Sequence, residues 1–346
     1  MVQYMGNQVE TGRERGADAL KKPNRRRKMG LYNFKGLLIF LVVFGHLLEP
    51  LSGGTVNYLY LLIYSFHMPA FIFLSGWFSG RTTLRRTLTG VLLPYLVFQP
   101  AYLLYAGLPV QFYAPYWIMW YLFTLFLWRL LVPVLQKRAF LPWVLFPLSV
   151  LVSLLCGYVP WIGYNFALSR ALVFLPCFLA GYALGRRKNL VRPRLKARPH
   201  RTLSLAAALG CMAVLFLLRN TIQRSWTFGA SSYAWSGSSP GVRLLLVVMA
   251  LLWIWFFLAW IPEGKVFFLT TLGRNTMFVY LLHGFFKLWL DARAPAVYHY
   301  GAFGNLLLAF LLSLGLCVLF GNYWLGGVWR WLMEAWRYFL REIGRR

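Results

Sequence analysis

The sequence predicts an all-α, polytopic integral membrane protein that crosses the bilayer about ten times. Three observations support this: 60% of the 346 residues are apolar, 13% are charged, and the mean hydropathy is +0.58. An average soluble domain is about half apolar and about a quarter charged. A disordered basic tail would lack the large apolar side chains, and a soluble nucleic-acid-binding domain would carry more acidic residues. The composition excludes both classes, and we expect no nucleic-acid partner.

Ten segments are apolar and long enough to be spanning helices, which need about 20 mostly apolar residues. Trp and Tyr gather near their ends, where membrane proteins place interfacial aromatic belts. Four prolines lie inside or near the ends of the segments, where membrane helices tolerate them. The predicted spans are residues 31–49, 57–78, 88–107, 115–135, 141–159, 168–185, 203–219, 243–261, 272–290 and 304–325.

The segments that flank the spans have distinct compositions. Residues 1–30 are polar and basic, which predicts a disordered cytoplasmic segment before the membrane domain at 31–325. Residues 326–346 are amphipathic, with Trp and Arg, which predicts a tail along the inner membrane surface. The loop 220–242 is rich in Ser, Gly and aromatic residues, and we expect it to form an external cap.

The distribution of basic residues predicts the orientation of the spans. The chain has 36 Lys and Arg against 8 Asp and Glu, a formal net charge of +28. Of the 36, 27 lie in the N-terminal segment, in alternate loops and after residue 325. Because loops rich in Lys and Arg stay on the cytoplasmic side, both termini are predicted to be cytoplasmic. We expect a multi-pass protein of the cell (plasma) membrane, whose anionic lipids are partners of this basic face.

The four cysteines lie singly within apolar segments, without the spacing of a metal site. They are interpreted as small core residues, and no metal site is predicted. The four are Cys156, Cys177, Cys211 and Cys317.

Ionisable side chains at membrane depth are candidates for function because they are costly to place there. His46 and Glu49 are three residues apart and share a helix face. The carboxylate can therefore orient the imidazole as a general base requires. A structural His–Glu pair at the membrane interface is an equally good interpretation of the pair alone. Lys35 lies about 16 Å from His46 along the helix, at the cytoplasmic end, where a lysine can also simply reach the interface.

Other polar side chains can join His46 in one chamber. His67 lies near mid-membrane, where Pro69 frees a backbone carbonyl one turn earlier. Arg170 opens the sixth span from outside, against the charge trend. His283 is about as far from the inner face as His46, which suggests a shared chamber in the outer half of the membrane. Packed core histidines are the alternative.

The end of the second span carries Arg81, Arg85 and Arg86 on the cytoplasmic side. These arginines can hold phosphate groups bidentately, or they can simply enforce the topology. Ser75, which precedes them, can be a nucleophile or, beside Gly76, a residue for close helix packing.

Several stretches, in order along residues 31–325, form a recognisable set. They are Asn33 to Pro50, Phe66 to Gly76, Leu93-Pro94-Tyr95, Trp120-Tyr121-Leu122, Phe174-Leu175-Pro176 with Gly181-Tyr182, and Gly273 through His283. This ordered set resembles the acyltransferase-3 family of polytopic membrane acyltransferases, especially its fucose 4-O-acetylase-like branch.

The resemblance implies transfer of an acyl group from cytoplasmic acyl-CoA, expected to be acetyl-CoA, to a hydroxyl of a cell-surface or lipid-linked glycan. Acyl-CoA is then a co-substrate, and no permanently bound cofactor is expected. His46 matches the family's catalytic histidine. From the spacing of the pair, we expect Glu49 to orient its ring. Lys35, Arg81, Arg85 and Arg86 are expected at the acyl-CoA end, and His67, Ser75, Arg170 and His283 at the substrate.

Two positions depart from the family pattern. Asn33 stands where relatives often have aspartate, and Lys35 where many have arginine, which weakens the case for bidentate phosphate recognition there. The alternative functions are a transporter or glycan flippase without acyl transfer, or a non-catalytic scaffold. Against a transporter, the two halves of the chain show no matching pair of Gly/Pro-interrupted segments.

Overall fold

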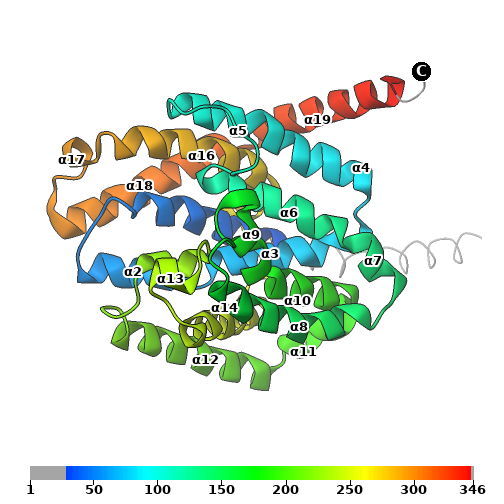
Figure 1. Ribbon diagram of the computed structural model, residues 1–346. Helices are drawn as coiled ribbons and strands as arrows, with labels where there is room; N and C mark the ends of the chain where they lie inside the picture. Colours follow the sequence, from blue (N-terminus) through cyan, green and yellow to red (C-terminus); the bar gives the residue numbers. More distant parts are fainter. Residues whose placement is uncertain (1–28, 344–346) are drawn as a thin grey trace, which may run out of the picture.

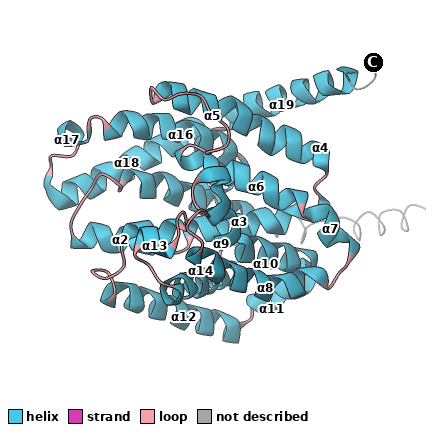
Figure 2. Ribbon diagram, in the orientation of Figure 1, coloured by secondary structure: helices cyan, strands magenta, loops and turns pink. Residues whose placement is uncertain are grey.

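The computed structural model describes residues 29–343, and every regular element in this range is a helix (Figure 1, Figure 2). Most of the predicted basic segment 1–30 lies outside the described residues. The long helices run roughly side by side in one bundle (Figure 1). The protein is therefore an all-α, polytopic membrane protein, as predicted.

Eight helical segments of the described chain are long and apolar enough to cross a membrane, and each corresponds to a predicted span; some of them join two shorter helices. Their bounds are Met29–Leu47, Gly54–Arg81, Leu84–Tyr105, Trp117–Lys137, Leu141–Tyr158, Arg198–Leu217, Pro240–Trp260 and Gly301–Gly321.

A ninth span is present if α9 (Leu168–Val173) and α10 (Leu175–Arg186) are taken together. The two helices meet at a bend of 56°. Pro176 accounts for this bend, because proline lacks the N–H that would continue the hydrogen bonds of α9 and its ring clashes with the preceding turn.

The remaining predicted span, 272–290, is two helices, α15 (Phe267–Arg274) and α16 (Thr276–Asp291), which join at Asn275. The Asn275 amide donates hydrogen bonds to the carbonyls of Gly321 and Asn322 instead of lying in a continuous helix. With 16 residues, α16 is shorter than a helix that crosses the hydrocarbon core. The described chain thus has eight or nine candidate spans where about ten were predicted.

The helix Met29–Leu47 is fixed to the loop before α15 by Asn33. The Asn33 amide donates to the carbonyls of Pro262 and Gly264, each 2.8 Å away. The Thr270 hydroxyl donates to Asn33 Oδ1 at 2.5 Å. An ionised aspartate at this position could not donate to either carbonyl. The departure from the family pattern at this position therefore suits a structural role.

The helices α3 (His67–Phe78) and α10 pack along their length with their backbones in contact. A Cβ atom at Gly181 would overlap the carbonyl of Phe73, and one at Gly76 would overlap the carbonyl of Phe178. Small residues allow such close approach between membrane helices. This contact fixes α3, the helix that begins at His67, against α10.

The helix α2 (Gly54–Tyr64) ends one turn before Pro69, and α3 begins at His67. Pro69 cannot donate a backbone hydrogen bond to the turn before it, which explains the break.

The remaining α-helices are α4 (Leu84–Thr87), α5 (Leu93–Tyr105), α6 (Trp120–Leu130), α7 (Val132–Lys137), α8 (Leu141–Leu155), α11 (Lys188–Leu195), α12 (Arg198–Leu217), α13 (Tyr233–Ser236), α14 (Pro240–Trp260), α17 (Ala294–Val297), α18 (Gly301–Gly321) and α19 (Tyr323–Ile343).

All four cysteines are buried and free, as expected of core residues. The helix α19 leaves the bundle at one edge and carries the C-terminal end away from it (Figure 1). This helix includes most of the predicted amphipathic tail, 326–346. The location of the tail on the inner membrane surface stays a prediction.

Candidate active site

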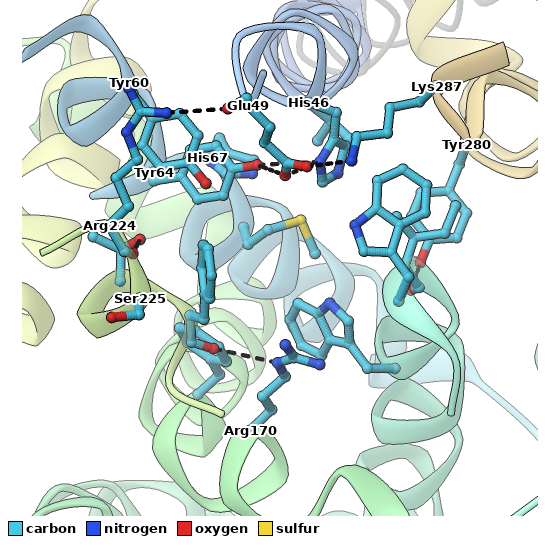
Figure 3. Close-up of a pocket in the computed structure, with 18 residues that line it drawn as sticks. His46, Glu49, Tyr60, Tyr64, His67, Arg170, Arg224, Ser225, Tyr280 and Lys287 are labelled. Carbon is cyan, nitrogen blue, oxygen red and sulfur yellow. Dashed lines mark hydrogen bonds and ion pairs between the residues drawn. The ribbon is translucent and has the colours of Figure 1, made fainter. Parts of the chain in front are cut away.

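A cavity of about 430 Å³ lies beside the end of the helix Met29–Leu47 (Figure 3). Its wall also takes residues from α2, α3, α6, α9 and α16. The 3-10 helix Arg224–Phe228, in the loop 220–242, supplies a further part of the wall. This loop therefore covers the cavity, in agreement with its predicted role as a cap.

His46 is the histidine on this wall with a carboxylate partner. Its Nδ1 atom lies 2.9 Å from Glu49 Oε1, and the Tyr64 hydroxyl donates to the same oxygen at 2.7 Å. Because a carboxylate only accepts, His46 Nδ1 carries the proton and donates it to Glu49. The neutral ring is then left with a lone pair on Nε2. This is the tautomer that a general base needs.

Lys287 fixes the other oxygen of the same carboxylate. Its Nζ atom lies 2.6 Å from Glu49 Oε2 and 2.6 Å from Asp291 Oδ2, one turn further along α16. Figure 3 shows Lys287 reaching Glu49 across the end of the cavity. Each Glu49 oxygen therefore has a cationic or polar partner, which orients the carboxylate toward His46.

The charge environment keeps Glu49 ionised. Glu49 lies two residues beyond the end of the helix Met29–Leu47, in the turn that follows. Burial would raise the pKa of its carboxyl, but His46 and Lys287 outweigh burial and lower this pKa from 4.5 to about 2. At neutral pH the Glu49 carboxylate can stabilise an imidazolium on His46.

Trp117 packs against both His46 and Lys287. Its ring centroid is 4.7 Å from that of His46, and Lys287 Nζ lies 4.8 Å from a Trp117 ring centroid. The Trp117 backbone has φ of 38°, in the left-handed region that non-glycine residues rarely adopt. Such strain is found at functional sites that the surrounding structure holds in place.

The other two candidate histidines occupy different positions. His67 lines the cavity and donates from Nδ1 to the Ile63 carbonyl at 2.9 Å. His283 stacks on His46 with ring centroids 5.5 Å apart, so the predicted proximity of the two rings is observed. His283 is fully buried, donates from Nδ1 to the Val279 carbonyl, and is not part of the cavity wall.

Two arginines complete the charged lining. Arg224 holds the cap: its guanidinium donates to Asn57 Oδ1 and to the carbonyls of Glu49 and Leu51. Arg170, on α9, points into the cavity from the side opposite His46 and Glu49 (Figure 3). The cavity therefore combines a base, its carboxylate and two guanidinium groups in a largely aromatic wall.

The comparison with protein families decides the class to which the protein belongs. The sequence model of an acyltransferase domain matches residues 30–322. The chain belongs to the acyltransferase 3 family. Searches of the curated proteins and of the solved structures return no significant match. Membership makes the protein a membrane acyltransferase, which uses an acyl donor and an acceptor.

A second cavity of this acyltransferase, of about 320 Å³, lies along the helix Met29–Leu47, which also carries His46. Lys35 and Arg129 line it, and Arg129 Nε is buried without a hydrogen-bond partner in the described chain. An unpaired donor of this kind at membrane depth is costly, which makes Arg129 a candidate for binding a ligand. Tyr280 lines both cavities, so the two meet at this side chain.

Ser75 lines the second cavity, away from His46. Its hydroxyl is 2.7 Å from the Tyr121 hydroxyl and donates to the Phe71 carbonyl at 3.0 Å. The acyltransferase structure thus does not bring Ser75 to the His46 imidazole. The three arginines after α3 are exposed and line neither cavity, although their neighbours Phe78 and Gly90 line the second. These three are Arg81, Arg85 and Arg86.

Three residues of this acyltransferase escaped the reasoning from sequence. Lys287 and Arg129 are lone cations in apolar segments. This signal could have made both of them candidate site residues, as it did for Lys35. Tyr64 carried no such signal, because a tyrosine near a span end is common in membrane proteins.

Proposed function

We propose that this acyltransferase moves an acyl group, expected to be acetyl, from acyl-CoA to a hydroxyl of a cell-surface or lipid-linked glycan. In this proposal it is a plasma-membrane protein with both termini in the cytoplasm. The observation that carries the proposal is the His46–Glu49–Lys287 network at the wall of a cavity, in a chain of this family.

The proposed reaction is direct transfer. His46 Nε2 accepts the proton of the acceptor hydroxyl, whose oxygen attacks the thioester carbonyl carbon. The carbon–sulfur bond then breaks, and the CoA thiolate leaves with the proton from His46. Glu49 stabilises the imidazolium between these steps, as the carboxylate partner of a catalytic histidine does. Positioned proton transfer of this kind contributes a rate factor of about 100 to 10,000.

The donor is proposed to occupy the second cavity, with its phosphates near Lys35 and Arg129. Both side chains are cations, and arginine in particular suits phosphate groups. The thioester end then passes Tyr280 to reach His46. Lys35 and His46 are about 16 Å apart along one helix, so the two cavities serve the two ends of an extended donor. Arg81, Arg85 and Arg86 are proposed to attract the donor at the exposed end of this path.

The proposal is tested by acyl transfer from labelled acetyl-CoA in membranes that contain the His46→Ala protein. We expect transfer to fall by about 100-fold or more, because the proton acceptor is lost. His299→Ala is the matched control: His299 is exposed and donates from Nδ1 to the Ala296 carbonyl. Full activity of the His46→Ala protein, or equal loss in the control, would reject the proposal. Mass spectrometry of the product shows whether the acetyl group is attached to the acceptor.

A further inference from the structure

The charged groups of the His46 cavity differ in how many partners they have. Lys287 and Glu49 neutralise each other. Arg224 directs all three of its guanidinium nitrogens to oxygen acceptors at 3.0 to 3.3 Å and lies over the Tyr60 ring. Arg170 makes one hydrogen bond, from Nε to the Phe228 carbonyl at 3.3 Å.

The two terminal nitrogens of Arg170 are cationic donors of this cavity that have no acceptor in the described chain. Within residues 29–343 they have no hydrogen-bond acceptor, and no carboxylate lies within 4.0 Å of the guanidinium. Aromatic rings flank the group instead: its central carbon lies 5.0 Å from a Trp120 ring centroid and 5.4 Å from that of Tyr164. A cation between aromatic faces in a low-dielectric site binds an anion more strongly than one in water.

We propose that the acceptor presents an anionic group, a phosphate or a carboxylate, to Arg170 while its hydroxyl faces His46. This inference rests on the proposed function, because it names the class of acceptor for that reaction. Figure 3 places Arg170 across the cavity from His46 and Glu49, so one acceptor can reach both. The planar guanidinium matches both anions bidentately.

The anion belongs to the acceptor because the donor's charges are accounted for elsewhere. Lys35 and Arg129 line the cavity proposed for the donor phosphates, and a transferred acetyl group carries no charge. The Trp117 and Trp120 rings on the wall of the His46 cavity suit the apolar face of a sugar. We therefore expect an acidic sugar or a sugar phosphate as acceptor, in preference to a neutral sugar.

The test uses three soluble acceptors with one ring: glucose, glucuronate and glucose 6-phosphate. Purified wild-type, Arg170→Lys and Arg170→Met proteins are assayed with acetyl-CoA. For wild type we expect a KM about tenfold or more lower with one of the charged acceptors than with glucose, since only a charged acceptor makes charge-assisted hydrogen bonds to Arg170. The better charged acceptor distinguishes phosphate from carboxylate.

Arg170→Met is expected to remove this preference by raising KM for the charged acceptor to about the value for glucose. Arg170→Lys is expected to keep part of the preference, because lysine retains the charge but lacks the planar guanidinium that binds an anion bidentately. Arg293→Met, at an exposed arginine, is the control and should behave as wild type. The shift of the thermal midpoint by each sugar measures binding without turnover and should follow the same order.

The outcomes separate the two proposals. Equal KM and equal stabilisation for charged and neutral sugars in wild type would overturn the inference while transfer itself upheld the proposed function. The Arg170→Met protein is also assayed with succinyl-CoA as the donor. If it loses transfer from succinyl-CoA but not from acetyl-CoA, the anion belongs to the acyl group, and this result would also overturn the inference. Absence of transfer by wild type to every sugar, with no stabilisation by any, would count against both.

Discussion

At the scale of single residues, Glu49 is the centre of the site. It lies in the turn after the helix Met29–Leu47, and its two oxygens face different partners. Oε1 accepts from His46 and Tyr64, and Oε2 accepts from Lys287. These contacts determine the tautomer of His46, so chemistry on one side chain depends on three others. The consequences can be tested one side chain at a time.

Lys287→Met tests the contact to Oε2. Methionine keeps the length of the side chain but removes the charge, so Glu49 loses the partner that orients it. We expect kcat to fall by about 10-fold to 100-fold, as when partners that orient a functional side chain are removed elsewhere. Lys137→Met, at an exposed lysine at the end of α7, is the matched control. Unchanged turnover in the Lys287→Met protein would show that the contact is dispensable.

The pKa of Glu49 predicts a pH dependence of stability. Because the pKa falls from 4.5 to about 2 on folding, ionised Glu49 stabilises the fold above pH 4.5, and this is lost as the pH falls through 2. The midpoint difference between wild type and Glu49→Gln in detergent should be largest above pH 4.5 and shrink toward pH 2. Glu334→Gln, at an exposed glutamate, should show no such trend. A difference that grows with acidity would contradict this.

At the scale of elements, the contact with α10 fixes the position of α3, the helix that supplies His67 to the cavity wall. The backbones touch where Gly76 and Gly181 face the opposing helix. The sequence showed both glycines but not which helices they would join. A small residue permits the close approach of another helix but does not determine which helix approaches. The break between α2 and α3 was predictable, since the effect of Pro69 is local.

Gly181→Leu tests this contact. The added side chain would overlap the Phe73 carbonyl, so we expect a loss of about 1–3 kcal/mol in stability, measured as a lower thermal midpoint in detergent. Gly210→Leu on α12 is the control, because a Cβ at Gly210 meets no atom within 4 Å. Equal midpoints for the two variants would contradict the packing described for α3 and α10.

At the scale of the whole molecule, the sequence predicted most of the spans and only part of the site. Span length follows from bilayer thickness, so apolar runs locate spans without knowledge of the fold. The prediction of one continuous span over 272–290 was wrong, because the Asn275 amide donates hydrogen bonds to the carbonyl of Gly321 in α18 and to that of Asn322. Only the tertiary structure brings these groups together. The contact of Lys287 with Glu49 was likewise invisible, because it joins distant parts of the chain. His46 with Glu49 was predictable, since three residues on one helix are always neighbours.

The predicted orientation can be tested with reporters at the two ends of the chain. Both termini are expected in the cytoplasm, because the basic residues concentrate on alternate loops and at the termini. A fluorescent reporter that folds only in the cytoplasm should be active at either end, and an alkaline phosphatase reporter should be inactive at both. Activity of the phosphatase at one end would reject the even number of spans.

The central claim is that donor binding and proton transfer belong to two cavities that meet at Tyr280. It is tested most directly by measuring acetyl-CoA affinity and turnover in two purified variants, His46→Gln and Lys35→Met with Arg129→Met. We predict that His46→Gln loses about 100-fold or more in turnover and keeps the wild-type Kd for acetyl-CoA. The double variant should instead bind acetyl-CoA about tenfold or more weakly. Wild-type turnover in His46→Gln, or an unchanged Kd in the double variant, would contradict the account.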